Sequence, residues 1–302
     1  MTLNKERDVA KAYDGQLSYP DEQGNLVELR VGIKVRGNYR RDKAHCDNPP
    51  LRVINDTKKD KSSLFSKLKD VKLVIPCNNS RKYQRFVIME YLIYRMYNQL
   101  SALSYRVRLV EINLVNSEKG ATLTFPAFFI EPHRDLAKRL DKKKIDVESV
   151  DVNELEPEGL AMLSLFQYMI SNTDYSPIRG AADENCCHNV KLYRGKDNQQ
   201  FTAIPYDFDF AGLVNATYAI PNPKVRIRSV RARRYRGYCG QNDSVRSLVA
   251  QFNSTRESIE ELVALSGLTD KSKSNTTKYL ARFFETVNDP KKLEKNVLGY
   301  CR

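Results

Sequence analysis

The chain has 302 residues, 41% of them hydrophobic, and its 50 basic against 37 acidic residues give a net charge of +13. This length is enough for one large domain or two lobes with a sizeable core. No run of about 18 apolar residues is present, so we expect no membrane span, and the polar start is not a signal peptide. An exported form with a missing upstream signal stays open. The charge favours an anionic partner: phosphates, nucleic acid or an acidic protein.

Six cysteines lie at positions 46, 77, 186, 187, 239 and 301, without a CxxC pair or metal-ligand spacing. Two interpretations remain: free thiols, or one or two disulfides in an exported protein.

The first half of the chain predicts a β-rich region. Residues 1–24 are polar, with turn signals at Asp14-Gly15 and Gln23-Gly24, and residues 27–35 then alternate strictly between apolar and polar, as in a strand. A basic turn follows at 36–41, where a glycine would let the backbone approach phosphate oxygens; the alternative is a solvated hairpin tip. Strands are expected at 51–54 and 71–75, with a lysine-rich loop at 57–69.

A helix is expected over residues 80–100, because apolar residues recur there at spacings of three and four. Its buried stripe comprises Phe86, Met89, Ile93, Met96, Tyr97 and Leu100. Glu90 lies on or beside this stripe. It either pairs with Arg52 or Lys34, or reaches water at the edge of the stripe.

The next elements are expected to be strands at 107–115 and 123–130, the second closing on Glu131. A charged surface helix and loop at 133–150 and a helix at 157–171 follow, then short strands at 188–193 and 201–205. Asp174, Asn189 and Asp207 each follow or precede such an element, so their side chains are expected to converge on one site.

The stretch 204–210 places Asp207 and Asp209 in alternation with three aromatic residues. As a strand, it would put both carboxylates on one face. Two carboxylates that close call for a cation, and hard oxygen ligands select Mg²⁺ or Mn²⁺. The alternative is an exposed edge strand whose acidic side chains face water.

The segment 224–236 carries seven basic residues among apolar ones. As a strand, it would place Lys224, Arg226 and Arg228 on one face, suited to phosphates or an acidic peptide; a solvated edge strand is the alternative. Two closing helices are expected at 243–265 and 272–287.

The order of these parts resembles the spore coat protein H (CotH) kinase-like family, a divergent branch of the protein-kinase-like fold, over about residues 25–215. The most specific pieces are residues 36–38, 167–174 and 204–209. The resemblance implies a two-lobed α+β fold. An N-terminal antiparallel sheet plus helix (1–132) would cover the nucleotide, and a mostly helical lobe (133–302) would carry the catalytic and metal site.

The resemblance also implies roles for individual residues. Asp174 would be the catalytic aspartate, and the metal ligands would be Asn189, Asp207 and Asp209. The nucleotide-binding set would be Lys34, Arg36, Gly37, Asn38, Arg52, Glu90 and Glu131. Two departures from kinases stand out. Asn189 comes 15 positions after Asp174, a longer spacing than in kinases, so residues 178–187 must loop out. The second strand carries Arg52 where lysine is usual.

These expectations describe a monomeric, ATP- and Mg²⁺- or Mn²⁺-dependent enzyme that transfers the γ-phosphoryl group to a protein hydroxyl, with acidic proteins among the candidate substrates. The alternative is a non-catalytic protein whose basic face at 224–236 binds nucleic acid or an acidic partner. A metal-dependent nuclease built on Asp207 and Asp209 is the third interpretation. Nucleic acid is less favoured, because beyond Tyr235 and Tyr238 the segment offers no aromatic stacking platform.

Overall fold

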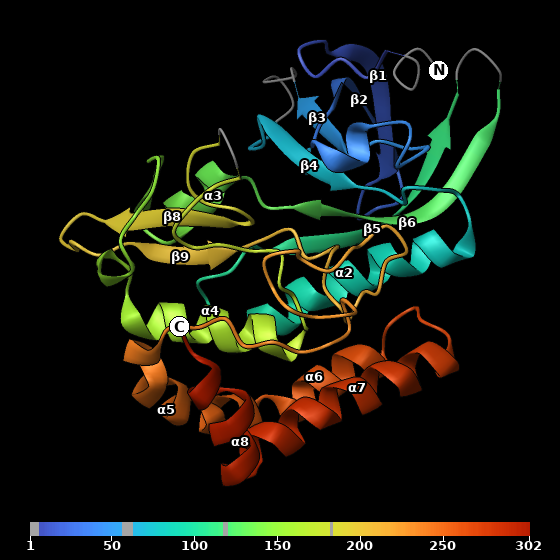
Figure 1. Cartoon of the computed structure of the whole chain (residues 1–302). Helices are drawn as coiled ribbons and strands as arrows, with labels where there is room; N and C mark the ends of the chain where they lie inside the picture. The colour runs from blue at the N-terminus through green and yellow to red at the C-terminus, as the bar shows by residue number, and fades with distance from the viewer. Residues whose placement is uncertain (1–5, 56–62, 117–119, 182–183) are drawn as a thin grey trace. The chain divides into compact units, whose positions relative to one another are not determined.

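The computed structural model describes residues 6–55, 63–116, 120–181 and 184–302 of an α+β protein (Figure 1). Its contacts divide the chain into two compact units. Unit 1 comprises Met1–Val87 and Val107–Pro132, and unit 2 comprises Ile88–Arg106 and His133–Arg302. In the described ranges, no helix has both the length and the apolar character needed to cross a membrane.

Unit 1 contains a six-stranded antiparallel sheet in the order β1-β2-β3-β4-β6-β5. Its strands are β1 (Tyr13–Pro20), β2 (Leu26–Val35), β3 (Leu51–Asn55), β4 (Asp70–Val74), β5 (Val107–Val115) and β6 (Thr122–Ile130). The five strands predicted from alternation are confirmed. Part of the predicted lysine-rich loop, residues 56–62, lies outside the described residues.

Strand β1 was not predicted, and the turn expected at Asp14-Gly15 is wrong. Asp14 pairs with Gly32 and Gly15 with Val31 in the β1–β2 ladder. A Cβ atom at Gly15 would lie 2.8 Å from Ile33 Cδ1, so this glycine serves close packing within the sheet.

Helix α2 (Arg81–Leu100) buries all six residues of its predicted stripe. Glu90 is only 2% exposed. The interpretation that Glu90 reaches water is therefore wrong, whereas its pairing with Arg52 or Lys34 stays a prediction.

Unit 2 begins its own sheet where the sequence predicted a surface helix and a loop. Helix α3 (His133–Arg139) leads into β7 (Lys142–Ile145), which pairs with β8 (Val190–Gly195), and β8 pairs with β9 (Thr202–Pro205). Strand β7 was missed because three consecutive lysines, Lys142–Lys144, hide any alternation.

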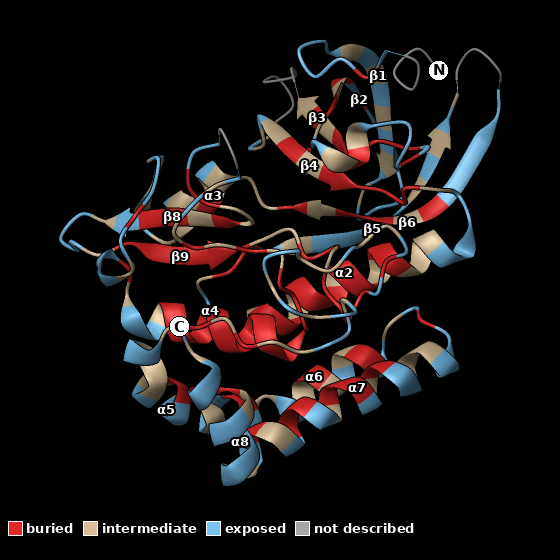
Figure 2. Cartoon of the chain, viewed as in Figure 1, coloured by how far each residue is buried: buried red, intermediate tan, exposed pale blue. Residues whose placement is uncertain are grey.

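Helix α4 (Pro157–Met169) is buried on all sides after its first turn, since every residue from Leu160 to Met169 is buried (Figure 2). Four further helices follow, α5 (Asn242–Ser254), α6 (Arg256–Ala264), α7 (Asp270–Asn288) and α8 (Pro290–Asn296). The single helix expected at 243–265 is wrong, because the chain breaks at Thr255, whose hydroxyl donates back to the carbonyls of Gln251 and Phe252.

Segment 224–236 forms turns and irregular structure, so the predicted strand, with Lys224, Arg226 and Arg228 on one face, is wrong. Its aliphatic residues Val225, Ile227 and Val230 are only half-buried. Arg233 explains part of this path, because its guanidinium leaves the segment to donate to the carbonyls of Met169 and Tyr279.

All six cysteines are paired, as Cys46–Cys77, Cys186–Cys187 and Cys239–Cys301. The free-thiol interpretation is therefore wrong, and the three pairs exceed the one or two disulfides considered. Disulfides of this kind are characteristic of oxidising environments.

Candidate functional site

The β8–β9 hairpin brings Asn189 and Asp207 together. Val190 at the start of β8 pairs with Pro205 at the end of β9, and the Tyr206 backbone N–H donates to the Asn189 carbonyl at 3.1 Å. Asn189 and Asp207 both have left-handed backbones, with φ of +51° and +64°. Asn and Asp tolerate this conformation better than most residues, and such strain is concentrated at functional sites.

The stretch 204–210, expected as a strand or a strand end, is the end of a strand and does not continue as one to Asp209. β9 ends at Pro205, and the left-handed backbone of Asp207 redirects the chain. Phe208 and Asp209 are then both buried in succession, so Asp207 and Asp209 do not share an alternating face. The nuclease interpretation loses the shared strand face, and it stays a prediction. A role for Asp209 as a metal ligand stays a prediction.

Asp174 meets Asn189 directly despite their separation in the sequence. The Asn189 side-chain Nδ2 donates to the Asp174 carboxylate Oδ2 at 3.0 Å and to the Asp174 backbone carbonyl at 2.8 Å. Ser176 and His188 exchange two backbone hydrogen bonds, of 2.9 and 3.1 Å, which draw the two segments together. The described residues of the stretch expected to loop out, 178–181 and 184–187, form neither helix nor strand, in agreement with that expectation.

His188 is a site residue that the sequence analysis passed over. Its Nε2 lies 2.8 Å from Asp174 Oδ1, so both carboxylate oxygens of Asp174 have partners. This hydrogen bond raises the pKa of His188; partial burial opposes the rise, and the nearby charge of Asp207 adds to it. The sequence feature that could have identified His188 is its position next to Asn189, in a chain that has three histidines in all.

Tyr94 fixes the backbone of Asp207. Its hydroxyl accepts the Asp207 N–H at 2.9 Å, and its ring packs edge-on against Phe208, with centroids 4.7 Å apart. Both rings are fully or nearly fully buried. The position of Asp207 is therefore set by the core on one side and by the hairpin on the other.

Lys191 adds a cation to the same hairpin. Its ammonium lies 5.3 Å from the centre of the Tyr206 ring. Burial lowers the pKa of Lys191, the like charge of Lys144 acts in the same direction, and the Asp207 carboxylate opposes both.

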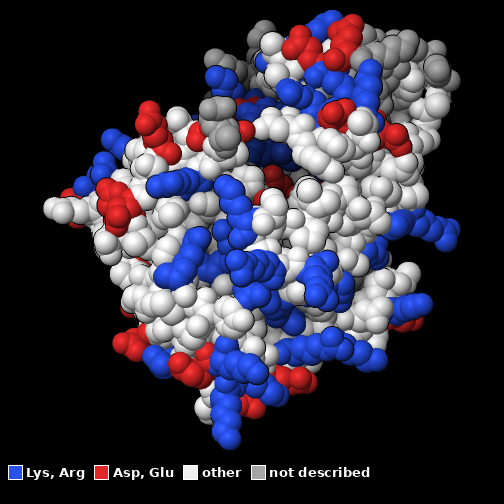
Figure 3. Space-filling model, in the orientation of Figure 1, with Lys and Arg blue, Asp and Glu red and all other residues white. Residues whose placement is uncertain are grey.

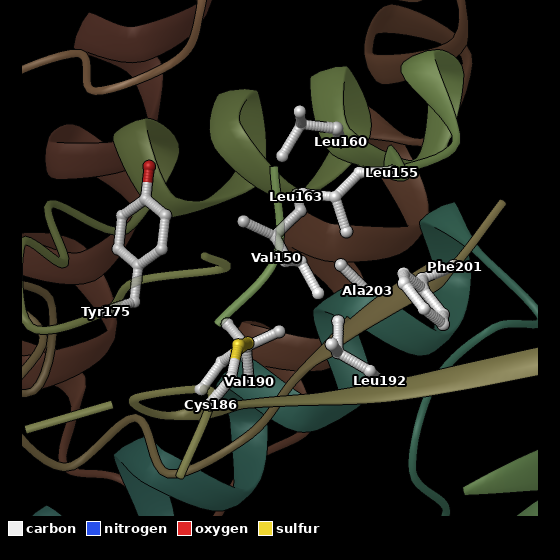
Figure 4. Close-up of a cluster of buried hydrophobic side chains, with 11 residues drawn as sticks. Val150, Leu155, Leu160, Leu163, Tyr175, Cys186, Val190, Leu192, Phe201 and Ala203 are labelled. Atoms are coloured by element: carbon white, nitrogen blue, oxygen red, sulfur yellow. A yellow bond between two sulfur atoms is a disulfide. The ribbon is translucent and has the colours of Figure 1, made fainter. Parts of the chain in front are cut away.

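A hydrophobic cluster anchors the backbone next to Asp174, His188 and Asn189 (Figure 4). Tyr175 follows Asp174, Val190 follows Asn189, and the paired Cys186 and Cys187 precede His188; all four are buried in this cluster. The backbone that carries these site residues is therefore held in place, because the neighbouring residues cannot move without opening the core.

Arg236 holds the Asp174 segment from the other side. Its Nη1 donates to the carbonyls of Thr173 at 2.6 Å and Tyr175 at 2.7 Å, the residues that flank Asp174. Asn222 Nδ2 donates to the same Thr173 carbonyl at 3.0 Å. The irregular segment after residue 220 thus takes part in shaping the site.

The donor atoms fit a cation that is shared with phosphates. Asn189 uses its amide nitrogen on Asp174, which leaves its Oδ1 as the atom that could coordinate a cation. Mg²⁺ prefers oxygen ligands and is commonly held by one or two protein groups together with substrate phosphates. Among the described residues, no group of three or more His, Cys, Asp or Glu is arranged to hold a metal ion without such help.

In unit 1, basic side chains form a row across three strands. Lys34 on β2 pairs with Arg52 on β3, and Arg52 pairs with Lys72 on β4, so the three lie on one face. The opposite face carries the hydrophobic core of unit 1. Arg52 also forms an ion pair with Asp70, with 2.8 Å between Nη1 and Oδ1.

The turn at residues 36–38 follows β2 directly. Gly37 has a φ of +79°, which side chains rarely adopt, and Arg36 is held to β3 through its backbone N–H and its Nε. The turn leads into a short 3-10 helix, Tyr39–Arg41, with Arg40 buried, so it is not a simple hairpin tip. Asn38 immediately precedes this helix, and Glu131 immediately follows β6.

Comparison with protein-family models and with curated proteins finds no match to this chain.

Proposed function

We propose that the chain is a protein-kinase-like phosphotransferase that binds ATP with Mg²⁺ or Mn²⁺ and transfers the γ-phosphoryl group to a protein hydroxyl. The observation that carries this proposal is the convergence of Asp174, Asn189 and Asp207 from three separate segments of unit 2. Phosphoryl transfer needs positioning and charge stabilisation more than covalent help, and an aspartate beside two oxygen donors supplies these elements.

Each residue has a distinct role in this proposal. Asp174 accepts a hydrogen bond from the acceptor hydroxyl and orients it, while His188 and Asn189 hold its carboxylate in place. Asn189 Oδ1 and the Asp207 carboxylate hold the cation, which when bound neutralises charge on the phosphates. In unit 1, Lys34, Arg52 and the turn at 36–38 bind phosphate oxygens.

The first test is thermal unfolding of the full chain with ATP, GTP or ADP, each with and without Mg²⁺ or Mn²⁺. A ligand at about 100 times its dissociation constant stabilises the folded state by about 2.7 kcal/mol. Asp207→Asn is expected to abolish the metal-dependent part of this shift while the protein stays folded. Asp197→Asn is the matched control, because Asp197 is exposed in the β8–β9 turn at the other end of the hairpin. A full metal-dependent shift in Asp207→Asn would remove Asp207 from the site.

Asp174→Ala separates binding from transfer in the same assay. Orientation of the acceptor is mainly a transition-state role, so nucleotide affinity should be retained while phosphoryl transfer to protein is lost. If transfer is undiminished, Asp174 has no part in the mechanism.

A further inference from the structure

Segment 224–236 and residues near position 300 enclose a pocket of about 600 Å³ in unit 2. Eight residues line it, and five are basic: Lys224, Arg226, Arg234, Arg236 and Arg302. The other three are Val225, Tyr235 and Tyr300, so none of the lining residues is Asp or Glu. Within the described part of the chain, none of the five basic residues forms a salt bridge. Figure 3 shows the concentration of Lys and Arg on one face of unit 2.

Neutral groups hold the arginines of this cationic pocket. Arg234 stacks over Tyr300, with 4.4 Å from its guanidinium carbon to the ring centre, and Arg302 stacks over Tyr238 at 4.5 Å. Arg302 also donates to the Tyr238 hydroxyl at 2.7 Å. The disulfide Cys239–Cys301 joins the two segments that carry these residues. Three of the five positive groups, those of Arg234, Arg236 and Arg302, are therefore ordered before any ligand arrives, which lowers the entropic penalty of binding.

The charge of the pocket identifies the chemistry of its ligand. Burial lowers the pKa of Arg236, and the like charge of Arg302 acts in the same direction, so the assembled cations are unfavourable to one another. A ligand with two negative charges in a small volume relieves this repulsion better than a single carboxylate. Guanidinium groups also match the oxygens of a phosphoryl group in pairs.

Two observations favour a polypeptide over a nucleic acid as the carrier of that phosphoryl group. Guanidinium groups already lie over Tyr300 and Tyr238, and Arg236 lies 5.0 Å from the Tyr175 ring centre, so these rings do not form a stacking platform for bases. Arg236 also joins the pocket to the carbonyls that flank Asp174. A chain held in the pocket therefore lies close to the residue that orients the acceptor hydroxyl.

We propose that the cationic pocket binds a phosphorylated side chain of the polypeptide substrate, so that a segment already carrying one phosphate is presented to Asp174 for another transfer. This rests on the proposed phosphotransferase function. It adds a substrate class: polypeptides with several acceptor hydroxyls in close sequence.

The test measures binding of fluorescent peptides to the full chain by anisotropy, without nucleotide. Three peptides share one sequence and carry serine, glutamate or phosphoserine at a single position. The phosphoserine peptide is expected to bind about tenfold or more tightly than the other two, since a charge-assisted hydrogen bond contributes about 1.5–3 kcal/mol. Equal affinity for the serine and phosphoserine peptides would overturn the proposal, and equal affinity for the glutamate and phosphoserine peptides would overturn its phosphate specificity.

Arg226→Gln and Arg228→Gln form a matched pair of variants. Both residues are exposed and lie two positions apart, but only Arg226 lines the pocket. Arg226→Gln should weaken phosphoserine-peptide binding about tenfold, the equivalent of about 1.4 kcal/mol, whereas Arg228→Gln should leave it unchanged. Equal losses in both variants would show general surface attraction and overturn the pocket assignment.

Competition identifies the ligand class. Unlabelled phosphoserine peptide should displace the probe at far lower concentration than inorganic phosphate or a single-stranded oligonucleotide. Displacement by phosphate at the same concentration would overturn the polypeptide assignment. Tighter binding of the oligonucleotide, lost in Arg226→Gln, would replace it with nucleic acid. The binding assay contains no nucleotide, so its result does not depend on the ATP tests. A protein that binds the phosphopeptide but fails the ATP tests would refute the phosphotransferase function and leave the pocket assignment intact. An active enzyme without phosphopeptide preference would refute only the pocket assignment.

Discussion

At the scale of single residues, Asp174 is held from two sides by groups with different chemistry. Asn189 is a permanent donor, whereas His188 changes its charge near neutral pH. When His188 is protonated, its Nε2–H donates to the Asp174 carboxylate and shares the negative charge there. The His188–Asp174 contact thus makes the stability of the site dependent on pH.

His188→Gln tests this dependence through stability. The folded-state pKa of His188 is raised above its ordinary value of 6.5. A raised histidine pKa contributes stability that is fully present below about 6.5 and is lost as pH rises through the folded value. The melting temperature of the wild type should therefore exceed that of His188→Gln most at about pH 5–6, and the difference should shrink towards about pH 9.

Asp174→Asn provides the control for that experiment. Without the Asp174 carboxylate, the main cause of the raised pKa is absent, so His188→Gln in this background should show a much weaker pH dependence. A stability difference that stays constant with pH in the wild-type background would contradict the ionic character of the contact.

The sequence could identify the residues that converge but not the residues that hold them. Asp174, Asn189 and Asp207 each border a segment with clear periodicity, so their meeting could be predicted. Their supports lie far away: Tyr94 is 113 residues from Asp207, and Arg236 is 63 residues from Thr173. Neither has a local pattern that distinguishes it, because its role is created by packing between distant segments.

At the scale of elements, the disulfide Cys239–Cys301 connects stability with the cationic pocket. It closes a loop of 62 residues, for which restriction of the unfolded chain corresponds to about 4 kcal/mol. Replacing both cysteines with serine should lower the free energy of unfolding by about that amount in denaturant titrations. Phosphoserine-peptide affinity should also fall, since Arg302 adjoins Cys301.

The Cys46–Cys77 pair in unit 1 is the natural comparison, with a sequence separation of 31. Its double serine variant should lose stability to a similar extent, since halving the loop changes the entropic effect by only about 0.6 kcal/mol. Its affinity for the phosphoserine peptide should be unchanged when measured well below the melting temperature. Loss of affinity in both double variants would mean that the pocket responds to global stability and not to the local crosslink.

Elements with clean alternation were predictable, and those with competing signals were not. β5 and β6 are rich in β-branched and aromatic residues, and β2 follows a simple apolar–polar alternation. β1 has such a pattern too, but its Asp-Gly pair indicates a turn when the partner strand is unknown. Segment 224–236 shows the opposite error. Its alternation resembles a strand, yet arginines such as Arg233 and Arg236 find acceptors on other segments and pull the backbone out of a sheet.

At the scale of the whole molecule, unit 1 is built from two stretches of chain separated by residues 88–106. β4 is inside the sheet only because it pairs with β6, which comes after this insertion. The α+β class and the order of sheet before helices followed from the sequence. The division of α2 between the units did not, because helical periodicity shows which residues are buried but not which neighbours bury them.

A fragment of residues 1–87 should therefore fail to fold. It would lack β5 and β6, leave β4 as an open edge and remove Phe125 and Ala127 from the core of unit 1. Far-UV circular dichroism should show little sheet and no cooperative melting, in contrast to the full chain. A sharp melting transition in the fragment would mean that β1–β4 suffice as a folding unit.

The backbone bridge between Ser176 and His188 has an evolutionary consequence. Because it holds both ends of the intervening loop, and because Cys186 and Cys187 are buried beside His188, changes in loop length should be tolerated between Arg179 and Cys186 without moving Asn189 relative to Asp174, and the entropy of closing a longer loop grows slowly. Strands β8 and β9 have no such freedom, since a one-residue insertion within either would shift the register, reverse the face of every following side chain and carry Asp207 away from Asn189. Insertions and deletions among descendants of this chain should gather in that part of the loop and be rejected within the two strands.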